Sequence, residues 1–132
     1  MVAYSFKARF GPLIRSGVKT QTVRSDRKRH ARPGETLQLY TGMRTRSCKL
    51  LAKAVCLKVS PIRFVFRDDD PIIEIHGLRT NNWNGGLDHF ARSDGFADWA
   101  DLAAFWAKEH PGLGAFEGVL IQWTGDSLEL GE

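Results

Sequence analysis

Hydrophobic and polar residues alternate over several short stretches of this chain, and such alternation predicts half-buried β-strands. Residues 2–9 (VAYSFKAR) and 35–42 (ETLQLYTG) follow this pattern. Residues 20–24 (TQTVR) are rich in β-branched side chains, and residues 116–123 (FEGVLIQW) alternate cleanly. We therefore expect a strand at each of these four places.

The middle of the chain holds a longer β-rich stretch, residues 48–66 (CKLLAKAVCLKVSPIRFVF). Pro61 has no backbone N–H to give to a sheet, so the stretch is interpreted as two strands or one bent strand, interrupted at Pro61. A short strand is expected over residues 72–77 (IIEIHG). The composition of residues 78–86 (LRTNNWNGG) predicts a loop.

Helical signals are confined to short segments. Residues 11–17 (GPLIRSG) predict one helical turn, with Pro12 near its start. Residues 87–93 (LDHFARS) predict a second short helix, and Asp98 can cap a third that ends at residues 110–112 (HPG). About six strands with short helices inserted predict an α+β fold, most simply a small β-barrel.

Length and composition fit a single folded domain covering residues 1–132. The chain is 42% hydrophobic and holds 8 Phe and 4 Trp, enough for one core. It has no apolar run of 18 residues and no secretory leader, so neither a membrane span nor export is expected. Cys48 and Cys56 lie outside any CxxC pattern, which favours reduced thiols and a cytoplasmic location.

The net charge of +4 hides a strong asymmetry along the chain. Residues 1–67 hold 16 of the 19 Lys and Arg residues but only two acids, a balance of +14. Residues 68–132 carry three basic residues against 13 acids, a balance of −10. This polarity predicts either a basic face suited to a polyanion or two halves that neutralise each other within the fold.

The segment GVKTQTVR carries the most informative chemistry. Gly17 allows a tight turn that presents Lys19 and backbone N–H groups as an anion nest. Alternation predicts that Thr20, Thr22 and Arg24 share one face, where Arg24 offers a planar fork for phosphate or carboxylate. A partly buried site beside Arg24 would lower the pKa of Lys19 toward that of a useful base. The alternative is a surface lysine and a structural arginine.

The longer segment IRSGVKTQTVR resembles the signature of the ASCH family, roughly Gly-x-Lys followed by Thr and Arg after a short helix. Further along, RPGETLQLYTGMRT resembles the family's Pro-Gly strand and hairpin. FARSDGFADWADLAAFW resembles its Asp-Gly-Phe turn and helix, and FEGVLIQW its closing strand. ASCH domains are similar to PUA domains, small β-barrels that bind RNA. The resemblance therefore implies a PUA-like barrel with the Lys–Thr–Arg segment on the wall of a cleft.

Some ASCH members hydrolyse the acetyl amide of N4-acetylcytidine, and others have been proposed as ribonucleases or RNA-binding regulators. The resemblance implies Lys19 as base, Thr22 as nucleophile and Asp94 as acid/base, near the position of the family's catalytic glutamate. Aspartate is one methylene shorter than glutamate, and strict alternation puts Lys19 and Thr22 on opposite faces. The backbone must therefore turn near Thr20 for the two to meet. Asp94 could instead cap the turn at Gly95.

A basic cluster follows the motif and predicts phosphate contacts with a nucleic acid, although a charge run can also be a solvated face. Tyr40 is a candidate for stacking on a base, and Trp83 is either a second stacking platform or a loop anchor. The candidate nucleic-acid-binding residues are Lys19, Thr20, Arg24, Arg27, Lys28, Arg29, Arg32, Tyr40, Arg44 and Arg46.

Three functions are compatible with these features. The first is a module that binds RNA or a nucleoside or nucleotide ligand through a basic cleft. The second is an amidohydrolase acting on an N4-acetylcytidine-type nucleoside, or a ribonuclease using the same cleft. The third is a protein-interaction module whose acidic second half docks a basic partner. No metal or cofactor is expected, since the sequence lacks ligand spacings and phosphate-binding glycine loops, and it leaves the oligomeric state open.

Overall fold

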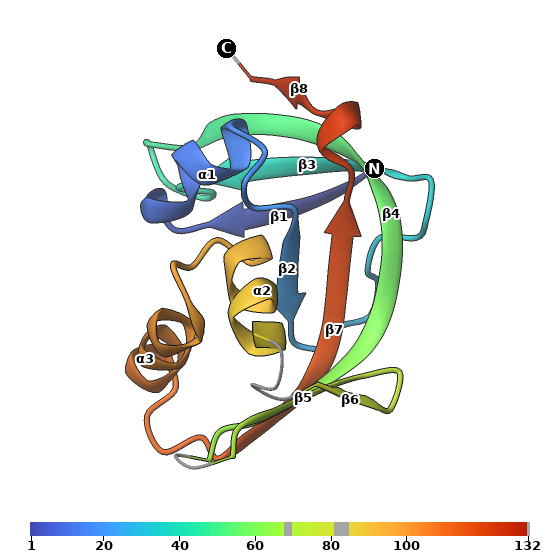
Figure 1. Cartoon of the computed structure of the whole chain (residues 1–132). Coiled ribbons are helices and arrows are strands. Elements are labelled where there is room, and N and C mark those ends of the chain that lie inside the picture. Colours follow the sequence, from blue (N-terminus) through green and yellow to red (C-terminus); the bar gives the residue numbers. More distant parts are fainter. Residues whose placement is uncertain (68–69, 81–84, 132) are drawn as a thin grey trace.

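The computed structural model of the chain describes residues 1–67, 70–80 and 85–131. Within these ranges it shows an α+β fold with one eight-stranded sheet and three short α-helices (Figure 1). The strands are β1 (Val2–Phe6), β2 (Gln21–Arg24), β3 (Thr36–Thr41), β4 (Lys49–Val65), β5 (Ile72–Ile75), β6 (Leu78–Thr80), β7 (Ala115–Trp123) and β8 (Glu129–Leu130). The helices are α1 (Gly11–Arg15), α2 (Gly86–Ser93) and α3 (Trp99–Glu109), with 3-10 turns over Ala8–Phe10 and Gly125–Ser127.

The strand β4 connects the two parts of the sheet. Its first half pairs with β3 and its second half with β5 and β7, and Figure 1 shows it curving from one part to the other. It is one bent strand, which confirms the second of the two alternatives, and its pairing with β7 continues through Pro61. Pro61 pairs with Val119 of β7, while β5 pairs with β4 only from Ile62 onward, so the missing N–H is tolerated. The register shifts instead between Cys56 and Lys58 in the pairing with β7, and opposite Leu39 and Tyr40 in the pairing with β3.

Two strands were not expected from the sequence, and they account for eight strands in place of about six. Residues Leu78–Thr80 form β6 rather than loop, because His76 (φ 51°) and Gly77 (φ 77°) make a two-residue turn that pairs β6 with β5. The other is β8, which pairs with β4 for only two residues, Ala52 and Lys53. A strand that short carries no detectable alternation.

The sheet is not closed into a barrel, which corrects the expectation of a small β-barrel. In the part of the chain that the structure describes, β1 pairs only with β3, and β2 pairs only with β7. A barrel would need a backbone ladder between β1 and β2. A side chain bridges them instead: Nη2 of Arg24 in β2 donates to the carbonyl of Ser5 in β1 at 2.7 Å.

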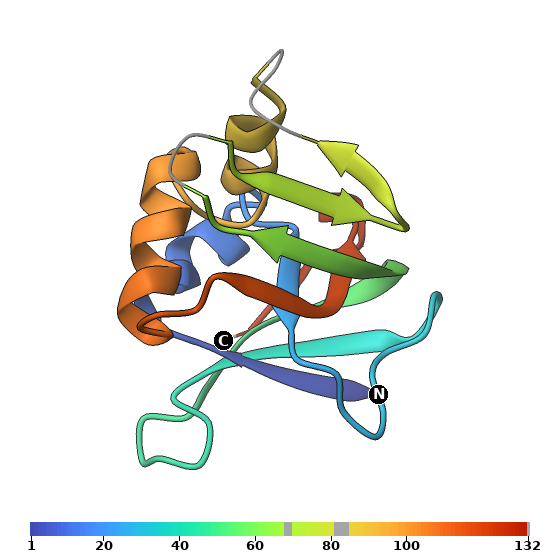
Figure 2. The same ribbon diagram turned by 90° about the horizontal axis from the view of Figure 1, so that it is seen from below.

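Aromatic packing fixes α2 and α3 against the sheet. The ring of Phe64 in β4 lies 5.8 Å from Phe90 of α2 and 5.1 Å from Trp106 of α3. Lys7, just after β1, pairs with Glu109 at the end of α3 at 2.8 Å, and Figure 2 shows α3 beside this end of β1. These contacts position the α2–α3 connection next to β1 and β2.

The two ends of α3 lie where the sequence predicts them. The predicted cap is confirmed, because Oδ1 of Asp98 accepts a hydrogen bond from the backbone N–H of Asp101 at 2.9 Å. The helix ends at Glu109, just before the HPG sequence. Among the helices over residues 1–67, 70–80 and 85–131, none is long and apolar enough to span a bilayer.

Candidate functional site

The backbone turns between α1 and β2, and this turn sets the position of Lys19. Gly17 has a left-handed φ of 83°, and the N–H groups of Val18 and Lys19 both donate to the carbonyl of Leu13 at 3.0 Å. The N–H of Thr20 donates to the carbonyl of Ser93, also at 3.0 Å. The expected anion nest is therefore wrong, since these N–H groups already have partners. Because β2 begins only after this turn, strand alternation does not fix the direction of the Lys19 side chain.

The Lys19 side chain is buried, with only 3% of its surface exposed. Its ammonium donates to the backbone carbonyl of Asp94 and lies 3.7 Å from Oδ1 of the same residue. The rings of Phe6 and Phe10 lie 5.5 Å and 4.7 Å from Nζ. A Cβ on Gly95 would come within 2.8 Å of the Lys19 side chain and 3.0 Å of Phe10. The absence of a side chain at Gly95 therefore makes room for this packing.

Asp94 follows directly on the last residue of α2 and is also buried. Its carboxylate contacts Lys19, and its Oδ1 lies 3.5 Å from the side-chain nitrogen of Gln21. The turn at Gly95 is held by the backbone, because the N–H of Gly95 donates to the carbonyl of Arg92 at 3.1 Å. The Asp94 side chain therefore points toward Lys19 rather than capping this turn.

Burial controls the electrostatics of the pair. It lowers the pKa of Lys19, with the carboxylate of Asp94 opposing this shift and the charge of Arg24 adding to it. Burial raises the pKa of Asp94, with the charge of Lys19 opposing. Both shifts favour the neutral forms. A buried amine with a lowered pKa gives up its proton more readily and can act as a base, and a carboxyl with a raised pKa can act as an acid.

Arg24 in β2 contacts Thr22 of the same strand and Ser5 of β1. Its Nε donates to Oγ1 of Thr22 at 3.0 Å, so the hydroxyl accepts this bond and keeps its own proton to give away. Burial lowers the pKa of Arg24 to about 10, the tyrosine Tyr4 opposes the shift, and the charge of Arg27 adds to it. At neutral pH Arg24 therefore remains a cation beside the Thr22 oxygen.

Lys19, Thr22, Arg24 and Asp94 line one cavity of about 290 Å³ beside β1, β2 and α3. Its apolar wall is formed largely by the aromatic residues Phe6, Phe10, Phe96, Phe105, Trp106 and Phe116. The structure thus brings together the three residues expected to be catalytic and the arginine of the motif. Thr20 does not share their face, because it precedes β2 and lies outside this cavity.

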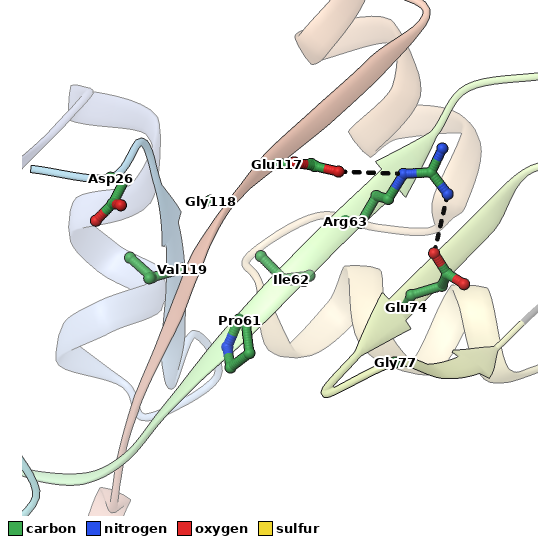
Figure 3. A pocket seen from close by; sticks show the side chains of 9 residues that line it. All are labelled: Asp26, Pro61, Ile62, Arg63, Glu74, Gly77, Glu117, Gly118 and Val119. Atoms are coloured by element: carbon green, nitrogen blue, oxygen red, sulfur yellow. Dashed lines mark hydrogen bonds and ion pairs between the residues drawn. The ribbon is translucent and has the colours of Figure 1, made fainter.

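A larger hollow of about 540 Å³ lies on the sheet surface formed by β4, β5 and β7 (Figure 3). Figure 3 shows Arg63 between two carboxylates, with Glu74 at 3.0 Å and Glu117 at 3.6 Å. These ion pairs lie at a largely exposed surface, where they contribute little to stability. The smaller cavity, which holds the buried charges, is therefore the better candidate site.

The basic residues of the loop after β2 and of the β3–β4 hairpin lie on the surface. Of the residues expected to bind nucleic acid, those that do not line the cavity are Thr20, Arg27, Lys28, Arg29, Arg32, Tyr40, Arg44 and Arg46. Arg29 pairs with Glu35 at 2.7 Å, whereas Arg27 places its guanidinium 4.7 Å from the ring of Tyr4. Arg27 thus packs on the same ring as Arg24. Trp83 lies outside the described residues.

Sequence reasoning missed the aromatic side chains around Lys19 and the amide of Gln21. Tyr4 and Phe6 alternate along β1, which predicts that they share a buried face but does not say what they pack against. Gln21 reads as an ordinary strand residue, and no local signal links it to Asp94. Both contacts depend on how distant segments meet.

Comparison of the chain with protein-family models, curated proteins and solved structures found no match.

Proposed function

We propose that this protein is an amidohydrolase that removes the acyl group from an N4-acetylcytidine-type nucleoside. The observation that carries the proposal is the buried Lys19–Asp94 pair, 3.7 Å apart, in the cavity that also holds Thr22 and Arg24. A buried ion pair contributes little net stability compared with well-packed apolar residues. A site with two shifted pKa values beside a hydroxyl is therefore better suited to chemistry than to stability alone.

The residues support a covalent route. Thr22 Oγ1 attacks the acyl carbonyl carbon while the neutral amine of Lys19 takes the hydroxyl proton. A C–O bond forms between Thr22 and the acyl carbon, and the C–N bond between the acyl carbon and N4 of the cytosine breaks. The departing N4 nitrogen takes a proton from the Lys19 ammonium or from Asp94. Water then hydrolyses the threonine ester, which releases acetate and restores the hydroxyl. The Arg24 guanidinium favours negative charge on the Thr22 oxygen.

The shape of the site also supports a small ligand. A cavity of about 290 Å³ lies near the lower end, about 300 Å³, of the range for small-molecule sites. Its aromatic wall offers surfaces on which a base can stack. The shorter side chain of Asp94, compared with the glutamate of the resembled family, still contacts Lys19.

The test is to incubate the purified protein with N4-acetylcytidine and follow the release of cytidine and acetate by chromatography. The wild type should release both, and Thr22→Ala should reduce the rate by about a thousandfold or more, since it removes the nucleophile. Thr22→Ser should keep part of the activity. Thr36→Ala, a partly buried threonine of β3, is the matched control and should remain active. An active Thr22→Ala variant would exclude the covalent route.

A second candidate function is RNA or nucleotide binding without hydrolysis. It is favoured by the exposed cations next to the site, above all Arg27. Binding of a short RNA should then weaken steeply with added salt, because phosphate contacts release counterions. Binding in the absence of any cytidine release from the nucleoside would favour this function over the amidohydrolase.

A further inference from the structure

We propose that the preferred ligand is a phosphorylated nucleoside whose phosphate binds Arg27, beside the charge of Arg24, next to the ring of Tyr4. This inference rests on the proposed nucleoside site and adds a second point of recognition. Arg27 would then have a role that the other exposed cations of the loop after β2 do not share.

The tyrosine ring holds both guanidinium groups in place. The guanidinium carbon of Arg24 lies 5.3 Å from the Tyr4 ring centroid, and that of Arg27 lies 4.7 Å from it. The two cations are therefore within about 10 Å of each other. The ring is itself fixed, because the Tyr4 hydroxyl lies 2.9 Å from Nδ1 of His30 and accepts a bond from the N–H of Ala31 at 3.2 Å.

Arg27 is oriented and unneutralised. Its Nε donates to the backbone carbonyl of Arg29 at 3.0 Å, which holds the guanidinium against the ring. Over residues 1–67, 70–80 and 85–131, no carboxylate lies within 4.0 Å of it, whereas the neighbouring Arg29 is paired with Glu35 at 2.7 Å. An exposed, preorganised fork next to a second cation is what recognition of a phosphate requires.

The position of Arg27 suits a phosphate attached to a ligand in the cavity. Ser25 lines the cavity and precedes Arg27 by two residues, a separation of at most about 7 Å along the chain. The carbonyl of Ser25 lies 2.9 Å from Nε2 of His30, and Nε of Arg27 donates to the carbonyl of Arg29. Both Ser25 and Arg27 are therefore held in place. A base in the aromatic cavity with its ribose directed outward would bring the phosphate toward Arg27.

The experiment compares kcat/KM for N4-acetylcytidine, for its 5′-monophosphate and for a short RNA carrying the same base. We expect at least a tenfold preference for the monophosphate over the nucleoside, which Arg27→Gln should largely remove. A preference for the RNA over the monophosphate that also needs Arg27 would support the same site with a strand as the source of the phosphate. Arg79→Gln, on exposed β6 and away from the cavity wall, is the matched control and should keep the preference.

Two outcomes would overturn the inference: equal kcat/KM for nucleoside and monophosphate in the wild type, or a preference that survives Arg27→Gln. If neither compound is hydrolysed, binding of cytidine and of cytidine 5′-monophosphate by calorimetry separates the two proposals. Tighter binding of the monophosphate that is lost in Arg27→Gln would keep the phosphate site and reject the amidohydrolase. Equal binding of the two would reject the phosphate site.

Discussion

Nζ of Lys19 lies 3.7 Å from Oδ1 of Asp94, although 75 residues separate the two along the chain and both side chains are buried. Lys19 comes from the turn before β2, and Asp94 follows α2. The contact therefore ties a helix end to a strand start and places an amine and a carboxyl in one cavity. Energetic coupling between the two residues is the first property to measure.

We predict that the two residues are strongly coupled in stability. Asp94→Asn should destabilise the fold by about 3 kcal/mol, because buried Lys19 then either keeps its charge without a counter-ion or gives up its proton. Lys19→Met should also destabilise the fold. The double variant should lose less than the sum of the two, since neither charge is then left alone. Urea unfolding of all four proteins gives the coupling energy, and additive losses would show that the pair is not a unit.

The pH dependence of the rate should report the pair. Because burial lowers the pKa of Lys19, kcat/KM for N4-acetylcytidine should rise with pH along a limb below 10.5, as the amine loses its proton. The carboxylate of Asp94 raises the pKa of Lys19. Asp94→Asn removes this charge, so the rising limb of its remaining activity should lie at lower pH than that of the wild type. A limb that does not move would assign the titration to another group.

The same shift has a consequence for stability. The unfolded chain holds the Lys19 proton up to the ordinary pKa of 10.5, whereas the folded chain releases it at lower pH. Between these two values the unfolded state binds more protons, so the stability of the wild type should increase with pH relative to Lys19→Met. Thermal unfolding of both proteins from pH 7 to 10.5 measures the difference. A constant difference over this range would contradict the lowered pKa.

The sequence predicted the parts of this structure that depend on local patterns. The strands around Tyr4, Leu39 and Ile121 follow from alternation, and the start of α3 follows from the cap at Asp98. The β5–β6 hairpin was missed because His76 adopts a positive φ, which is uncommon for a residue with a side chain. Closure of the sheet was wrongly expected because pairing of β1 with β2 is a long-range property that no local pattern encodes.

In the candidate site, too, local patterns predicted some features and long-range contacts were missed. The motif identified Lys19, Thr22 and Arg24 as candidates, and only the resemblance to the ASCH family linked them to Asp94. Strict alternation would have separated Lys19 from Thr22, and the turn at Gly17 removes that restriction. The burial that shifts the pKa of Lys19 comes from distant segments, so composition and spacing could not have given it.

Gly95→Ala should disturb the site as well as the fold. The residue has a φ of 94°, and an added Cβ would lie 2.8 Å from the Lys19 side chain and 3.0 Å from Phe10. We expect a loss of about 2–3 kcal/mol in the free energy of unfolding, from backbone strain and the clash together. Gly112→Ala is the matched control, because its φ is 79° but no atom lies within 4 Å of the added Cβ. It should lose only about 1 kcal/mol through the backbone. Equal losses in urea unfolding would show that the space beside Lys19 is not needed.

Arg24→Lys tests whether the geometry of the guanidinium matters beyond its charge. Arginine donates from Nε to Thr22 at 3.0 Å and from Nη2 to the carbonyl of Ser5 at 2.7 Å, and a single ammonium cannot reproduce this fork. We expect a fall of about a hundredfold in kcat for N4-acetylcytidine, because the Thr22 oxygen loses an oriented donor. Arg63→Lys, at the exposed ion pair in the larger hollow, should retain the wild-type rate. A near-normal rate in Arg24→Lys would reduce the role of this residue to its positive charge, and the bridge between β1 and β2 would then be its main contribution.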